Sequence, residues 1–451
     1  MEIVDRPLNL RRLIVLALIL GAGVAALMLV IPANLRKLLI LGVIVSPAIL
    51  FLFTRPRVLF YILTFFIFSK IYWYVGFSLF EITYIFAFVS WAVWALEKRR
   101  LVVHDPLFVS LVAAFCLLLF VSLVAARDID SSIYRLKHFV QLMAFLFLTM
   151  QFVGERKEFR IFLIIVALAA VTNNFLPMII TPPEIYSAPS IIASQGVIRF
   201  EGLLFEPNLL AFLQIFVIPI FLFYMFMYRR PRIVRPAALL AIIGSIAIIV
   251  LSFSRGGFIS LVFLLLVLFY LERRNRILLG FGIVLIVVGL ILVPPSYYIR
   301  IGSIFNALSA SGKDYPIFTR LQTMKSAIEL GIKNPVFGVG LENFKARTIV
   351  FTTFNLTVHN AFLQIFSELG VLAFGFFIAI ISYNIRLIRD LMRQEDVETA
   401  RVGMFLMLQH VAVLFNAMFI PVAYFQVLWY ALALPSLAHC AYRPPPTSGR
   451  K

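Results

Sequence analysis

The stretch PAALLAIIGSIAIIVLSFSRGGFISLVFLLLVLFYL, residues 236–271, contains a single charged residue, Arg255. The apolar runs on either side of Arg255 are long enough for two membrane-crossing helices joined by a tight turn. The whole chain shares this character, because 62% of its 451 residues are hydrophobic and 14% are charged, with a mean hydropathy of +1.01. A soluble domain is about half apolar and about a quarter charged. Disordered chains are poor in aromatic residues, which here make up 15%. The sequence therefore predicts an all-α, polytopic integral membrane protein.

Fourteen apolar segments are candidate membrane spans, although two are short for a bilayer and losing one hairpin would leave twelve. The segments are residues 13–31, 38–53, 58–75, 80–96, 106–125, 136–153, 159–177, 207–228, 236–253, 257–271, 277–293, 360–384, 401–420 and 424–441. Clusters of Arg and Lys, such as those at 229–235 and 386–401, fall on one side of this arrangement. By the positive-inside rule, both termini lie in the cytoplasm.

Two connections on the extracytoplasmic side exceed hairpin length, at residues 181–206 and 294–358. Within the second, residues 316–330 have apolar side chains at helical spacing, which predicts an amphipathic helix. We treat 1–451 as a single membrane domain that ends in a short basic cytoplasmic tail at 442–451.

Motifs for nucleotides and metals are missing from the sequence. It has no phosphate-binding loop of the Walker type, and its five histidines lack the spacing of zinc ligands. Asp128-Ile129-Asp130 formally matches an acidic pair that holds divalent cations in many enzymes. Capping of the following helix by Asp130 or Ser131 is the better interpretation, because Asp and Ser are favoured caps. We therefore expect neither a metal nor a cofactor.

Three arginines and one histidine stand where apolar spans begin on the outer side, or in the long loop there. Arg199 precedes the span at 207, Arg255 lies in a turn, Arg320 is in the loop, and His359-Asn360 opens the span at 360. Guanidinium groups suit phosphate, and a neutral imidazole can take a proton from a hydroxyl. The glycines after Arg255 would add backbone N–H groups to an anion site. This pattern predicts a diphosphate held by arginines beside a histidine base.

Simpler interpretations remain open for each of these residues. An interfacial arginine often only reaches toward water, and a single histidine at a helix start is often a cap or a structural residue. Glu206 is either a second carboxylate at the site or a helix-start residue beside Pro207. Glu368 lies nine residues after His359, on the opposite helix face, and we interpret it as a structural acid.

The chain resembles the O-antigen ligase and polymerase family of membrane glycosyltransferases. The resemblance rests on four blocks: Arg199-Phe-Glu-Gly-Leu-Leu-Phe-Glu-Pro-Asn208-Leu-Leu-Ala211, Ser254-Arg-Gly-Gly257, Asn334-Pro-Val-Phe-Gly-Val-Gly340-Leu-Glu-Asn-Phe344 and His359-Asn-Ala-Phe-Leu-Gln-Ile-Phe-Ser-Glu368-Leu-Gly370. It implies transfer of a glycan from an undecaprenyl-pyrophosphate-linked donor to an acceptor sugar, such as lipid A core, on the periplasmic face of a bacterial inner membrane. It also implies an inverting reaction that needs no metal or nucleotide.

Carried over residue by residue, the resemblance gives each candidate a role. Arg199 and Arg255 would bind the pyrophosphate, Arg320 would be a further phosphate or acceptor contact, and His359 would activate the acceptor hydroxyl. Asn360 would orient the histidine or a sugar hydroxyl. The alternatives are an O-antigen or exopolysaccharide polymerase with the same residues and, from another class, a transporter or flippase. A transporter should have its polar groups near the midplane of the membrane.

Overall fold

The computed structural model describes residues 54–72, 77–98, 101, 103–180, 199–228, 231–273, 280, 282, 284, 315–348 and 357–442. Within these ranges the chain forms helices and no β-strand, and seven of the helices are long and apolar enough to cross a membrane. The expectation of an all-α polytopic membrane protein is therefore confirmed. The spans at 13–31 and 38–53, most of the one at 277–293, and the tail after 442 lie outside the described residues.

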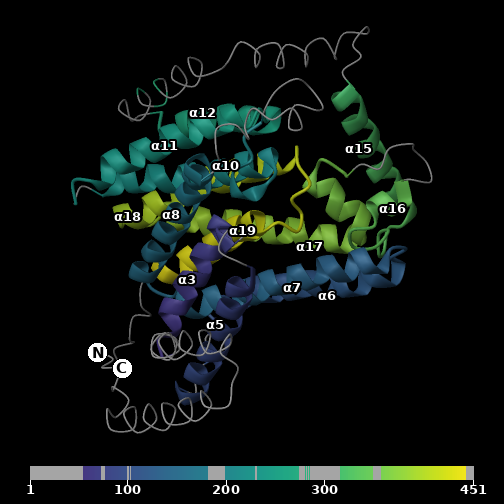
Figure 1. Cartoon of the computed structure of the whole chain (residues 1–451), viewed down its shortest axis with the longest axis horizontal. Helices are drawn as coiled ribbons and strands as arrows, with labels where there is room; N and C mark the ends of the chain where they lie inside the picture. The colour runs from purple at the N-terminus through teal and green to yellow at the C-terminus, as the bar shows by residue number, and fades with distance from the viewer. Residues whose placement is uncertain are drawn as a thin grey trace, which may run out of the picture. The chain divides into compact units, whose positions relative to one another are not determined.

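The helices follow the apolar segments of the sequence closely (Figure 1). They are α3 (Pro56–Ser69), α5 (Phe77–Lys98), α6 (Pro106–Ser122), α7 (Ile129–Phe152), α8 (Arg156–Ile180), α10 (Pro207–Met227), α11 (Val234–Leu251), α12 (Arg255–Leu271), α15 (Tyr315–Lys333), α16 (Phe344–Thr348), α17 (Ala361–Met392), α18 (Val397–Ala417) and α19 (Gln426–Tyr442). Every span expected between 58 and 271, and between 360 and 441, coincides with one of these helices. The largest difference is α17, which continues to Met392 instead of ending near 384.

The residues group into two compact units. The first comprises Met1–Leu63 and Glu81–Arg100, and its described part is the start of α3 and most of α5. The second comprises Thr64–Phe80 and Leu101–Lys451, and it contains every residue discussed below. The domain boundaries expected from the sequence stay predictions.

Helix α10 forms the centre of the second unit. It packs against α8, α11, α12 and α18, and 89% of its most apolar window is buried inside the protein. Its polar residue Gln214 is satisfied by Asn174 of α8, through two hydrogen bonds of 2.9 and 2.8 Å. Such pairing is required because a polar group in an apolar interior has no water to bond with.

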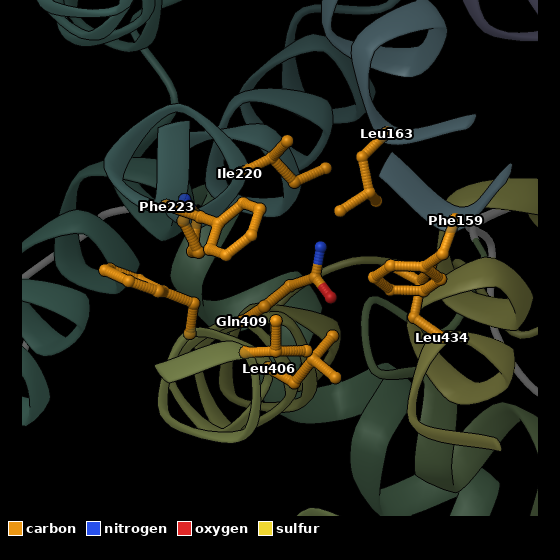
Figure 2. A pocket seen from close by; sticks show the side chains of 10 residues that line it. Phe159, Leu163, Ile220, Phe223, Leu406, Gln409 and Leu434 are labelled. Carbon is orange, nitrogen blue, oxygen red and sulfur yellow. The ribbon is translucent and has the colours of Figure 1, made fainter. Parts of the chain in front are cut away.

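A small apolar pocket lies between α8, α10, α18 and α19 (Figure 2). Gln409 of α18 extends into it and donates from Nε2 to the carbonyl oxygen of Phe216, at 2.9 Å. This bond lies beside Pro219, which interrupts the hydrogen-bond ladder of α10 because proline has no N–H. Gln409 therefore ties α18 to α10 close to the internal proline of α10.

Helix α15 confirms the amphipathic helix expected in the long outer loop. Its buried face carries the small residues Thr323 and Ala327, and it packs against α17. Leu321 and Ile328, two of the apolar side chains that form a stripe at helical spacing along this segment, are 61% and 44% exposed. The stripe thus points away from the neighbouring helices, as in a helix that lies in a membrane interface.

Candidate functional site

The start of α10 is shaped by Glu206 and the residue before it. Phe205 has a left-handed backbone (φ 53°) and turns the chain sharply. Glu206 then caps the helix, since its Oε2 accepts a hydrogen bond from the N–H of Leu209 at 2.5 Å, and Pro207 occupies the first turn. Its Oε1 accepts from Nδ2 of Asn208 at 2.7 Å. Of the two roles considered for Glu206, the structure shows the helix-start role.

The start of α12 repeats this design. Phe253 is left-handed (φ 49°), and Ser254 caps the helix by accepting from the N–H of Gly257 at 3.2 Å. A Cβ on Gly257 would lie 2.6 Å from the Cβ of Ala211 in α10. The glycine therefore permits close contact between the two helix starts. The expectation that this glycine offers its N–H to an anion is wrong, because Ser254 already accepts from that group.

Arg199 lies across these two helix starts. Its Nε donates to the carbonyl oxygen of Ser252 at 2.9 Å, and its NH2 donates to Oδ1 of Asn208 at 3.0 Å. Oδ1 of Asn208 also accepts from the hydroxyl of Ser254, at 2.9 Å. Asn208 thus ties the guanidinium to both helices. Two helix N-termini carry partial positive charge, so this corner is suited to an anion.

The neighbouring carboxylate Glu201 responds to this environment. Burial raises its pKa above the ordinary value, Arg199 lowers it in part, and the charge of Glu206 raises it again. The net rise means that burial, together with the charge of Glu206, opposes the negative charge of Glu201 more than Arg199 favours it.

Arg255 is the first residue of α12 and is half-buried. It stands at one end of an apolar groove between α12 and α18. The groove is lined by Arg255, Phe258, Ile259, Val262, Phe263, Leu266 and Phe415. A guanidinium group at the end of an apolar groove suits a ligand that has an anionic group and a hydrocarbon chain.

The start of α17 carries His359 and Asn360. Oδ1 of Asn360 accepts hydrogen bonds from the N–H groups of Phe362 at 2.9 Å and Leu363 at 3.0 Å, so it caps the helix. Nδ1 of His359 is buried, and no described residue hydrogen-bonds to it. Burial lowers the pKa of His359 to about 4, and the charge of Arg320 adds to this effect. The imidazole is therefore neutral at physiological pH, which is the form that can accept a proton.

A small apolar cluster brings Arg320 and His359 into range of each other. Val358, which precedes the histidine, packs with Ala327 and Leu330 of α15, with Val339 of the following segment and with Phe344 of α16. Arg320 lies seven residues before Ala327 on the same helix, about two turns away. The cluster therefore fixes α15 beside the start of α17.

The segment between α15 and α16, residues 334–343, packs against a break in α17, and we call it the docked segment. At Gly370 the backbone (φ 82°, ψ −178°) leaves the helix, in a region that only glycine adopts readily. The carbonyl oxygens of Ser367 and Glu368 accept from Val339 N–H at 2.9 Å and from Gly340 N–H at 3.0 Å. This segment thereby supplies hydrogen bonds that the interrupted helix cannot make.

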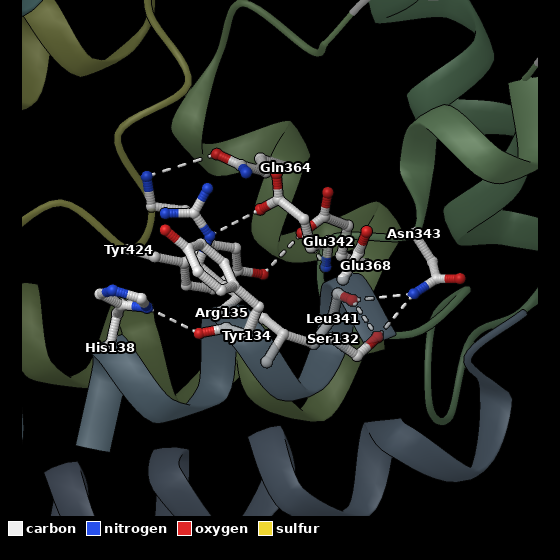
Figure 3. A network of polar contacts seen from close by, with 12 residues as sticks. Ser132, Tyr134, Arg135, His138, Leu341, Glu342, Asn343, Gln364, Glu368 and Tyr424 are labelled. Atoms are coloured by element: carbon white, nitrogen blue, oxygen red, sulfur yellow. Dashed lines mark hydrogen bonds and ion pairs between the residues drawn. The ribbon is translucent and has the colours of Figure 1, made fainter. Parts of the chain in front are cut away.

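Side chains extend this docking into a polar network (Figure 3). Oε2 of Glu368 accepts from the hydroxyl of Tyr424 at 2.8 Å and from the N–H of Glu342 at 3.1 Å. The carboxylate of Glu342 pairs with Nε of Arg135 in α7, at 2.8 Å. Oδ1 of Asn343 accepts from two N–H groups just before α7, that of Arg127 at 2.7 Å and that of Asp128 at 2.6 Å. The structural role that we expected for Glu368 is therefore what the structure shows.

Asp128, rather than Asp130 or Ser131, caps α7. Its Oδ1 accepts from the N–H of Ser131 at 3.1 Å and its Oδ2 from the hydroxyl of that residue at 2.7 Å. These bonds lower the pKa of Asp128. Capping was the expected role of this acidic pair, but Asp128 lies two positions before Asp130 and three before Ser131, the residues expected to cap. Across the described ranges, no group of three or more His, Cys, Asp or Glu residues could hold a metal ion.

The connection between α18 and α19 joins the two parts of the site. Phe419 lies against Gly256 at the start of α12, where a Cβ would be 2.9 Å from the phenylalanine Cβ. Further along, Ala423 N–H donates to Oε1 of Gln364 at 3.3 Å, and Tyr424 reaches Glu368. The starts of α10, α12 and α17 therefore belong to one polar end of the second unit.

Sequence reasoning missed Arg135, Glu342, Asn343 and Tyr424. Arg135 and Tyr424 stand in no motif, whereas Glu342 and Asn343 lie in one of the four blocks without having been given a role. The available signal was the block from Asn334 to Phe344, whose two glycines mark a backbone that must come close to another element. Both have positive φ, and a Cβ on Gly338 would lie 2.3 Å from the carbonyl carbon of Glu368.

The fold and the site define an all-α membrane protein whose polar end combines arginines, capped helix starts and a buried neutral histidine. Residues 239–378 match the family model described as O-antigen ligase. This match supports membership of the chain in the O-antigen ligase family, and with it a function of the O-antigen ligase or polymerase type. The matched residues include Arg255, Arg320, His359 and the docked segment, whereas Arg199 precedes them. A comparison with curated proteins found no match.

Proposed function

We propose that this protein transfers a glycan from an undecaprenyl-pyrophosphate-linked donor to an acceptor sugar, as an O-antigen ligase in lipopolysaccharide assembly. The observation that carries the proposal is the buried Nδ1 of His359, which no described residue engages, on an imidazole that is neutral at physiological pH. The family match supports the general type of reaction.

Arg199 and Arg255 bind the pyrophosphate of the donor. Arg199 is held in place by Ser252 and Asn208, so it needs no rearrangement to receive an anion. Arg255 stands at the end of the apolar groove, which accommodates the first part of a prenyl chain. Together they stabilise the charge that develops when the bond between the anomeric carbon and the pyrophosphate oxygen breaks.

His359 acts as the general base on the acceptor. It takes the proton of the acceptor hydroxyl while that oxygen attacks the anomeric carbon from the side opposite the leaving pyrophosphate, so the configuration inverts. Arg320 keeps the imidazole neutral and contacts phosphate or acceptor. Asn360 holds the start of α17 through its cap, and its side-chain N–H₂ orients the histidine or a sugar hydroxyl. No step requires a metal or a nucleotide.

The proposed location is the inner membrane of a bacterium, with both termini in the cytoplasm and the site on the periplasmic face. The partners are the lipid-linked glycan, the lipid A core and the surrounding lipids. A polymerase that extends a lipid-linked glycan would use the same residues.

The test is glycan transfer by purified protein in liposomes, with a lipid-diphosphate-linked oligosaccharide, lipid A core, a chelator and no nucleotide. His359→Ala should reduce turnover at least about 100-fold, the lower end of the contribution of a general base, while donor binding persists. Arg255→Ala should weaken donor binding. The matched controls His138→Ala, at an exposed histidine of α7, and Arg235→Ala, at the start of α11, should both transfer normally.

The products distinguish the alternatives. Glycan on lipid A core supports a ligase, whereas growth of the lipid-linked glycan alone supports a polymerase. Normal turnover of His359→Ala, or no product with either acceptor, would contradict the proposal and make transport the function to examine.

A further inference from the structure

The first part of α17 is a short element of its own. Residues 361–369 are helical, Gly370 departs from helical geometry, and the remainder runs on to Met392. The hydrogen-bond ladder does not pass the glycine undisturbed, because the carbonyl oxygens of Ser367 and Glu368 accept from the docked segment instead. The direction of this short helix therefore depends on what holds its far end.

Glu368 is the side chain that holds that end. It is 3% exposed and receives one hydrogen bond from the α18–α19 connection, through Tyr424, and one from the docked segment, through the N–H of Glu342. Glu342 is itself fixed to α7 by Arg135. Two other elements thus bond directly to the carboxylate of Glu368, and α7 is linked to it indirectly, through Glu342 (Figure 3).

A strained residue indicates that this arrangement is retained for a reason. Glu342 has a left-handed backbone (φ 59°), which is uncommon for a residue other than glycine, asparagine or aspartate. Its conformation presents the N–H to Glu368 and the carboxylate to Arg135 at the same time. Residues of this kind cluster where the surrounding structure is set for function.

The opposite end of the short helix carries His359. Nine residues of α-helix span about 13 Å, so a rotation of about 10° at Gly370 would displace the histidine by about 2 Å. A misplacement of about 1 Å can cost a reaction about 100-fold. The position of the imidazole is therefore sensitive to the contacts of Glu368.

We propose that Glu368 is a positioning residue that fixes His359 by fastening residues 361–369 to the docked segment and to Tyr424. It acts through hydrogen bonds that its carboxylate accepts and does not touch the substrate. The functional consequence rests on the proposed role of His359 as the base, whereas the effect on the position of the histidine does not.

The experiment compares Glu368→Ala with Glu368→Gln and uses two readouts. One is turnover and donor KM in the transfer assay. The other is the rate at which diethyl pyrocarbonate modifies His359, followed by mass spectrometry with exposed His138 as the internal reference. The matched control is Glu272→Ala, which also removes a buried carboxylate paired with an arginine, Arg401, at the other end of α12.

Glu368→Ala should lower kcat about 100-fold with donor KM unchanged, and should raise the modification rate of His359 about tenfold. Glu368→Gln should restore both values to within about threefold of the native protein, because its amide oxygen can accept the same two hydrogen bonds. Glu272→Ala should leave both readouts unchanged. Tyr424→Phe, which removes one of the two bonds without altering the packing, should raise the modification rate about threefold and serves where Glu368→Ala does not fold.

An unchanged modification rate in both Glu368→Ala and Tyr424→Phe would overturn the proposal. A Glu368→Gln protein as impaired as Glu368→Ala would overturn it too, because the charge would then be what matters. If the native protein transfers no glycan, the proposed function fails, and the modification rates still decide whether Glu368 positions the histidine.

Discussion

The polar end of the second unit has two halves, one around Arg199 and one around His359, and they are built in different ways. Around Arg199, the contacts join residues at the starts of α10 and α12 and at the end of α11, no contact spans more than 53 positions of the chain, and caps shape the two helix starts. Around His359, the contacts join α7, the docked segment, α17 and Tyr424, and the Arg135–Glu342 pair spans 207 positions. The corner at which we propose anion binding therefore rests on contacts between neighbouring helix ends, whereas the placement of His359, the proposed base, depends on long-range docking.

The halves also differ in how well their polar groups are satisfied. The Arg199 guanidinium is bound on two sides, but the buried Nδ1 of His359 has no hydrogen-bond partner among the described residues. A buried polar atom without a partner costs about 1–3 kcal/mol. This cost fits the proposal that Nδ1 of His359 gains its partner only when a substrate binds. Arg199 carries no such cost at Nε and NH2, because both already donate hydrogen bonds within the protein.

The largest effect should follow from a change in the docked half, Gly370→Ala. The substitution forces a Cβ into a conformation reserved for glycine and to within 2.6 Å of the carbonyl oxygens of Pro335 and Val336. We expect a loss of about 3 kcal/mol in the free energy of unfolding, measured by thermal unfolding in detergent. Gly375→Ala is the matched control in the same helix, because its Cβ meets nothing within 4 Å. Equal unfolding temperatures for the two variants would show that the backbone conformation at Gly370 does not contribute to the stability of the protein.

A smaller effect is expected in the locally built half, from Gly257→Ala. The new Cβ would lie 2.6 Å from that of Ala211, so α10 and α12 must separate, at a cost of about 1–3 kcal/mol. The double variant Gly257→Ala/Ala211→Gly removes the clash and should recover most of the stability and of the donor affinity. Failure of this rescue, with Ala211→Gly alone well folded, would mean that the two helix starts are not held by this contact.

The difference between the halves also explains what the sequence could predict. Apolar runs predicted the membrane helices of the described residues and an amphipathic pattern predicted α15, whereas α16 was not predicted. The residues at helix starts gave Arg199, Arg255 and His359 as candidates, because caps and spans are local patterns. The cap of α7 was predicted two or three residues too late, because the exact capping residue depends on where the first helical turn forms. Arg135 and Tyr424 could not be found, since nothing near them in the chain indicates that they meet Glu342 and Glu368. The kink at Gly370 was likewise hidden inside an apolar run that a straight helix would fit.

A third comparison of the halves uses pH, because the imidazole of His359 can gain a proton within the accessible pH range, whereas a guanidinium stays charged throughout it. The pKa of His359 is lowered to about 4 by burial and by Arg320, and the proposed role as a base requires the neutral form. Turnover should therefore persist as the pH falls below the ordinary histidine range and be lost near pH 4. Arg320→Gln removes the second cause, so the loss should move to higher pH, while remaining below 6.5 because burial persists. Lys325→Gln, on the exposed face of the same helix, should not move it. Rates measured across pH with saturating donor provide the test, and a profile unaffected by Arg320→Gln would separate this arginine from the base.

The smallest effect should come from the cap of α12, Ser254→Ala. The hydroxyl accepts from Gly257 N–H and donates to Asn208, and loss of a serine cap typically costs about 1 kcal/mol. Ser254→Thr retains the hydroxyl and should be nearly neutral by thermal unfolding. Because Oδ1 of Asn208 still accepts from Arg199 in the alanine variant, donor affinity should change by less than about threefold, and the guanidinium should stay in place. A large loss of donor affinity with normal stability would instead show that the hydroxyl itself contacts the anion. The anion would then bind to the Ser254 hydroxyl as well as to Arg199. The corner around Arg199 would in that case resemble the region around His359, because a polar group of the protein would gain its partner only when the ligand binds.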